Sequence, residues 1–216
     1  MYANVKTATT LPLSAALAAE PSVPRPRHRR RRIGSYRPDA RQLETFNRLL
    51  QRLGRSDTLD CDRLATAARR LRAPASSIPA CIAERLRQAE TLAWLAADPA
   101  WEPAPAAVSP LRAVLAYLEG DNDLIPDSVP EFGRFDDAIV VESAWPRLAG
   151  EVEAYLDFCR VREVEARLRG CGILQFRFGR DDWEVARRAE AALVAHQREV
   201  REHRYTPQWQ PLFRVH

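Results

Sequence analysis

Apolar residues recur every three or four positions along most of the chain, which is the spacing of one face of an α-helix. The clearest stripe follows Pro38 and Asp39 and ends at Gly54, a residue type that commonly closes a helix. The same spacing returns in residues 60–72, 77–98, 109–120, 136–144, 151–169 and 181–200. The pattern predicts an all-α protein built as a small helical bundle.

Two prolines interrupt this pattern in the middle of the chain. Pro126 and Pro130 each fix their own φ and push the preceding residue toward extended geometry, so residues 125–130 cannot form an ordinary helix. We call residues 121–134 the elbow, because they are expected to join two helices into a hairpin. Gly133 is expected to take a positive φ and to end the elbow. The side chains expected to point inward are Leu124, Ile125, Val129, Phe132 and Phe135.

Acidic side chains are concentrated in and around the elbow. Short acids commonly cap helices and close turns, and Asp136 or Asp137 would then be the N-cap of the second helix. The alternative is a divalent-cation site, since carboxylate oxygens are ligands for hard cations. Its candidate ligands are Asp123, Asp127, Asp136 and Asp137. The sequence favours a capping role for these acids, and the cation site stays the open alternative. No other cofactor is indicated.

The elbow also carries a family resemblance. The run Asp123–Asp127 (DLIPD), followed by Pro130, Gly133 and the pair Asp136–Asp137, resembles the signature of the YkvA-like family of bacterial domains of unknown function. The resemblance covers about residues 107–161. It implies a small helical hairpin domain that is often associated with membranes and has no assigned catalytic role.

Charge is unevenly distributed along the chain. The formal net charge is +4, but residues 1–72 carry 16 basic and 6 acidic side chains, whereas the remainder carries 17 and 23. Residues 20–38 are rich in proline and arginine and poor in apolar groups, and residues 1–38 as a whole are expected to form a disordered basic arm. Its candidate polyanion-binding residues are Arg27, Arg29, Arg30, Arg31 and Arg32. An anionic membrane surface or a nucleic acid would be the partner of such an arm.

Composition shifts divide the chain into segments. The predicted order is the arm at 1–38, a helical region at 39–98, a proline-rich linker at 99–110, the YkvA-like hairpin at 107–169, and a last helix with its tail at 170–216. No run approaches the ~18 apolar residues of a spanning helix. Four cysteines without metal-site spacing suggest a reducing compartment. The expected location is cytoplasmic, with attachment to the membrane surface as the alternative.

No catalytic motif accompanies these features. The chain has no glycine-rich phosphate loop, no G-x-S-x-G and no H-E-x-x-H. The sequence therefore favours a non-enzymatic interaction or scaffold protein with a protein partner that it does not identify. The alternatives are a metal-binding or metal-dependent domain that uses the acidic elbow and, more weakly, nucleic-acid binding through the basic arm.

Overall fold

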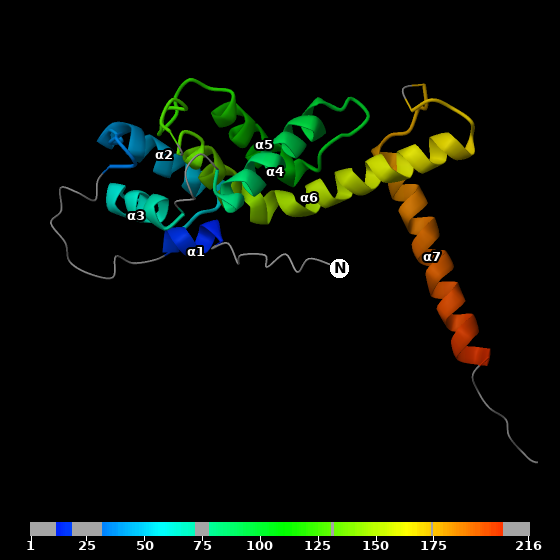
Figure 1. Cartoon of the computed structure of the whole chain (residues 1–216). Helices are drawn as coiled ribbons and strands as arrows, with labels where there is room; N and C mark the ends of the chain where they lie inside the picture. Colours follow the sequence, from blue (N-terminus) through cyan, green and yellow to red (C-terminus); the bar gives the residue numbers. More distant parts are fainter. Residues whose placement is uncertain (1–11, 19–31, 72–77, 131, 174, 205–216) are drawn as a thin grey trace, which may run out of the picture. The chain divides into compact units, whose positions relative to one another are not determined.

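The structure, a computed structural model, describes residues 12–18, 32–71, 78–130, 132–173 and 175–204. Seven helices and no strand are found there, so the predicted all-α class is confirmed (Figure 1). The helices are α1 (Leu13–Ala18), α2 (Ala40–Leu53), α3 (Cys61–Leu71), α4 (Ala80–Ala97), α5 (Pro105–Leu118), α6 (Phe135–Leu168) and α7 (Arg180–Arg204). None of these helices combines the length and the apolar character needed to cross a membrane.

The chain divides into two compact units. Unit 1 comprises residues 1–99 and 103–155, and unit 2 comprises residues 100–102 and 156–216. The predicted linker at 99–110 is only partly irregular, because α5 already begins at Pro105. Proline is favoured at the first helical position, where its missing N–H is not needed, and this explains a start several residues earlier than the sequence pattern predicts.

The first part of α6 is the core of unit 1. Four consecutive residues, Ala138–Val141, are buried, so α6 is surrounded there on every side. The helices around α6 contact it through polar interactions as well as through apolar packing. The Arg85 guanidinium of α4 pairs with Glu142, and the Arg147 side chain donates to the backbone oxygen of Arg52 in α2 at 2.9 Å. The other helices of unit 1 are therefore fixed around one central element.

The ends of α2 match the predicted boundaries at Asp39 and Gly54. The Asp39 carboxylate accepts the backbone N–H groups of Arg41 and Gln42 at 2.9 and 3.3 Å. Gly54 adopts a left-handed conformation with φ 112°, and its N–H bonds back into the last turn. Both signals are local, which is why the sequence alone located them.

Two stretches of the predicted disordered arm are folded. Leu13 and Leu17 of α1 are buried, and α1 packs on α3. Ile33 is also buried, and its backbone pairs with Tyr36 at 2.8 and 3.0 Å. The prediction of disorder is wrong for these two stretches, because their apolar side chains find cover in unit 1.

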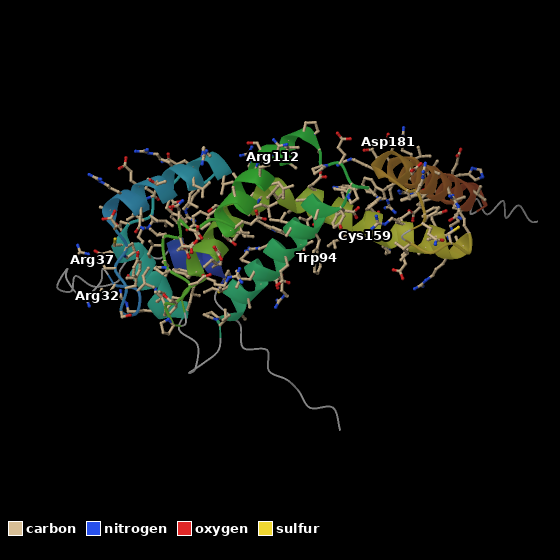
Figure 2. The ribbon with its side chains drawn as sticks, turned by 90° about the horizontal axis from the view of Figure 1, so that it is seen from above. Arg32, Arg37, Trp94, Arg112, Cys159 and Asp181 are labelled. Carbon is tan, nitrogen blue, oxygen red and sulfur yellow. The ribbon has the colours of Figure 1, made fainter. Side chains whose placement is uncertain are left out.

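The predicted polyanion-binding set lies almost wholly outside the described residues. Arg27, Arg29, Arg30 and Arg31 fall in the part of the chain that the structure does not describe. Arg32 is described and exposed, and Figure 2 marks its position near Arg37.

Unit 2 is organised around an aromatic cluster. Trp101 lies 5.0 Å from Phe158 and 5.4 Å from Trp183 between ring centroids, and Phe158 stacks on Phe178 at 5.8 Å. The Trp183 indole N–H donates to Asp157 at 2.8 Å. These contacts join the beginning of α7 to the second part of α6.

Candidate functional site

The elbow departs from helix as the prolines predict. Residues 121–130 and 132–134 are irregular, and tight turns such as the bond from Val129 N to Pro126 O at 2.9 Å hold the path. All five predicted inward side chains are buried: Leu124, Ile125, Val129, Phe132 and Phe135. The apolar filling of the elbow is therefore confirmed.

A tyrosine–carboxylate pair satisfies the buried backbone of the elbow. The Tyr117 hydroxyl donates to Asp136 Oδ2 at 2.6 Å and accepts the backbone N–H of Leu124 at 3.0 Å. The same Asp136 oxygen accepts the N–H of Ile125 at 3.0 Å. A buried N–H without an acceptor is costly, so these two side chains allow irregular backbone to enter the core. Asp136 is 1% exposed, and its second oxygen has no hydrogen-bond partner among the described residues.

Asp136 and Asp137 do not serve as the predicted N-cap. Helix α6 begins at Phe135, so both carboxylates lie in its first turn, where the helix dipole favours negative charge. The predicted cap is wrong, because a cap at Asp136 would require the helix to begin at residue 137, and α6 begins two residues earlier. Asp136 instead binds backbone across the elbow, which a reading of local sequence cannot reveal.

Gly133 serves a different purpose from the one predicted. The described glycines with positive φ are Gly34, Gly54 and Gly170, and Gly133 is not among them. A Cβ at Gly133 would meet the backbone of Asp127, lying 2.7 Å from its carbonyl carbon and 2.8 Å from its Cα. Glycine is therefore required here for the close approach of two backbone segments and not for a left-handed turn.

The four proposed metal ligands are not assembled into one site. Asp136 turns to Tyr117 and Ile125, and Asp137 pairs with Arg134 at 3.1 Å. Asp127 is exposed and Asp123 half-buried. Across the ranges that the structure describes, no group of three or more His, Cys, Asp or Glu side chains could hold a metal ion.

Burial is the main influence on the titration of this region. It raises the pKa of Asp136 to about 7, against the opposing effect of the hydrogen bonds from Tyr117 and Ile125. Burial also raises the pKa of Asp123, with Asp127 and Asp121 adding to the rise. For Asp137, burial raises the pKa while the hydrogen bond from Arg134 lowers it. The elbow therefore holds carboxyl groups that keep their protons longer than exposed ones do.

The raised pKa of Asp136 predicts that this residue contributes less to stability in neutral than in acidic solution. Because the folded-state pKa lies above the ordinary value of 3.8, the folded chain holds this proton more tightly than the unfolded chain. The resulting stabilisation is complete below pH 3.8 and is lost as the pH rises to about 7. Asp136→Asn is uncharged at every pH, so urea unfolding between about pH 5 and about pH 8 should give it a flatter stability profile than the wild type. Parallel profiles would contradict the assignment to Asp136.

Tyr117 is the functional residue that sequence reasoning missed. It lies in the last turn of α5, 19 residues before its partner Asp136. The only signal available was a tyrosine next to an acidic segment, which is too common a combination to indicate a buried pair.

Most of the described side chains of helix α7 are exposed. Every side chain from Arg188 to Glu202 is exposed, including Leu193 at 57%. Its beginning is held by Trp183 and by an ion pair of Arg187 with Asp157 at 3.3 Å. Figure 1 shows the rest of α7, coloured orange to red, beside no other helix of unit 2. Such a helix offers a surface and no enclosed cavity.

Comparisons of the chain with protein-family models, with curated proteins and with solved structures found no match.

Proposed function

We propose that the chain is a non-enzymatic interaction protein that associates with a second copy of itself through α7. The observation that carries the proposal is an exposed apolar face on a helix whose residues 188–202 are not covered by the rest of unit 2. By helical periodicity one face of α7 carries what we call the α7 stripe: Val185, Ala189, Ala192, Leu193, His196 and Val200. Val185 and Leu193 are 58% and 57% exposed.

Helix α7 has 25 residues, and most of the stability of a helix in a protein comes from packing of its apolar face and not from helix propensity. Ion pairs along α7, such as Arg198 with Glu202 at 3.0 Å, contribute only a few tenths of a kcal/mol each. Burial of the α7 stripe against another helix would supply the missing stabilisation.

The charges of α7 favour a helix as partner over a membrane. Residues 180–204 contain six arginines and six acidic residues, so the helix has no formal net charge. Helices that lie on anionic membranes carry an excess of lysine and arginine on their polar face. The distribution of charge also suits a second α7. Asp181, Asp182 and Glu184 lie at its start, and antiparallel pairing brings them near Arg198 and Arg201 of the other copy, with opposed helix dipoles.

The proposal is consistent with membership of the YkvA-like family, whose domains have no assigned catalytic role. We retain that membership as a second proposal. It is supported by the DLIPD run at 123–127 and by the glycine at 133, which the close approach to Asp127 requires.

Leu193→Glu is expected to weaken self-association by about ten-fold or more, because it places a charge in the paired face. Sedimentation velocity of the full chain over a range of concentrations measures this. Ala191→Glu is the matched control, since residue 191 lies on the charged face near Arg187 and Arg198 and the substitution adds the same charge. A wild-type chain that stays monomeric at every concentration, or equal weakening by both variants, would refute the proposal.

A further inference from the structure

A groove separates α2 from α5 in unit 1. Two adjoining hollows of about 610 and 440 Å³ share Leu49, Arg52 and Tyr117, and together they form what we call the α2–α5 groove. The two helices lie side by side, and Figure 2 shows Arg112 on α5 next to α2. Each volume lies within the range of small-molecule sites, roughly 300–1,000 Å³.

The lining of the groove is basic. Arg41, Arg52 and Arg112 line it, and no acidic side chain does. Elsewhere in unit 1, arginines pair with acids, as Arg48 does with Glu44. Among the described residues no ion pair is found for the three guanidinium groups of the groove. Like charges that line one concavity create a positive potential, which favours occupation by an anion.

Arginine is suited to oxyanions. Its planar guanidinium presents paired N–H donors that match the oxygens of phosphate and carboxylate groups. Neutral polar side chains add further hydrogen-bonding capacity around the three arginines. These side chains are Gln42, Thr45, Ser109 and Asn122.

The groove also has an apolar wall. Phe46 and Leu49 of α2 face the Tyr117 ring of α5, and the Phe46 and Tyr117 ring centroids lie 5.6 Å apart. Val108 and Ala113 extend this wall along α5. Phe46 and Leu49 are buried, so the apolar surface that is open to a ligand is that of the half-buried Tyr117, Val108 and Ala113. An inorganic anion alone would leave this surface uncovered, whereas an organic anion would cover it.

We propose that the α2–α5 groove binds a small soluble phosphate ester, with its phosphate held by Arg52 and the neighbouring arginines and its organic part packed on Tyr117, Val108 and Ala113. The inference is independent of the self-association proposed for α7, because it concerns a different unit and different side chains.

Tyr117 connects the groove to the elbow. Its ring lines both hollows, and its hydroxyl donates to Asp136 at 2.6 Å. A ligand that packs on the ring therefore stabilises the same side chain that supports the backbone of Leu124. Binding is expected to raise the unfolding temperature of the whole chain, as for any ligand that prefers the folded state.

The test is calorimetric titration of the full chain with phenyl phosphate and with inorganic phosphate, at physiological ionic strength to screen exposed charges. We expect phenyl phosphate to bind about ten-fold more tightly than phosphate, because its ring reaches the apolar wall. Arg52→Gln is expected to weaken phenyl phosphate binding by about ten-fold. Arg48→Gln is the matched control, since Arg48 is an exposed arginine of the same helix that does not line the groove, and it should leave binding unchanged.

Three outcomes would overturn the proposal. The first is no detectable binding of phenyl phosphate, and the second is equal weakening by Arg52→Gln and Arg48→Gln, which would indicate unspecific attraction. The third outcome is measured with vesicles of phosphatidylglycerol. If the chain binds these vesicles through Arg52 but does not bind phenyl phosphate, the groove is a site for a lipid headgroup. Both arginines are exposed, so thermal unfolding of each variant is expected to match the wild type and to exclude misfolding as the cause.

Discussion

Replacement of Asp136 by alanine is expected to lower the free energy of unfolding by about 3 kcal/mol, since it removes one acceptor from two buried donors. The Tyr117 hydroxyl and the Ile125 N–H both donate to the same oxygen, at 2.6 and 3.0 Å. Each donor left without an acceptor costs about 1–3 kcal/mol. The effect is largest at about pH 5, where Asp136 is mostly protonated and its removal relieves little buried charge.

Urea unfolding of matched variants measures this effect. Asp127→Ala removes an exposed acid of the same elbow and is expected to change stability by no more than about 0.5 kcal/mol. Tyr117→Phe completes a double-mutant cycle, in which Asp136→Ala and Tyr117→Phe should be strongly non-additive. Equal effects of Asp136→Ala and Asp127→Ala would mean that the buried pair does not support the elbow.

Gly133→Ala is expected to destabilise the protein by about 2–3 kcal/mol, because the new methyl group collides with backbone and not with a movable side chain. The added Cβ would lie 2.7 Å from the Asp127 carbonyl carbon and 2.8 Å from its Cα. Two turns of the elbow would have to separate to accommodate it. The apolar side chains between them would then lose contacts.

Gly150→Ala is the matched control for Gly133→Ala. Gly150 lies within α6 with nothing within 4 Å of an added Cβ, so alanine should stabilise the helix by about 0.5–1 kcal/mol. Thermal or urea unfolding of the two variants should therefore give changes of opposite sign. A neutral Gly133→Ala would show that the elbow can open at that point without cost.

Local signals account for the parts of the fold that could be predicted. Proline spacing located the elbow, Asp39 and Gly54 bounded α2, and the apolar pattern identified the buried side chains of the elbow. Each of these signals acts within a few residues, where backbone geometry and capping decide the conformation.

Tertiary contacts account for what could not be predicted. The direction of the Asp136 side chain depends on Tyr117, which α5 brings beside it, and the groove exists only because α2 and α5 pack together. The length of α6 was also open, since Pro146 could have started a new helix or bent the old one. The helix continues through it, and the packing of Leu148 and Val152 in the core favours that continuity.

Unit 2 is not a single stretch of sequence, which limits how the protein can be divided. Its aromatic cluster takes Trp101 from residues 100–102 and its other rings from residues beyond 156. A fragment that begins at residue 156 lacks this indole, and a fragment that ends at Tyr155 keeps the indole but removes the rings of Phe158 and Trp183. A single cut in the gene therefore cannot release either unit intact, and isolation of residues 156–216 requires Trp101 to be replaced or to be transplanted with them.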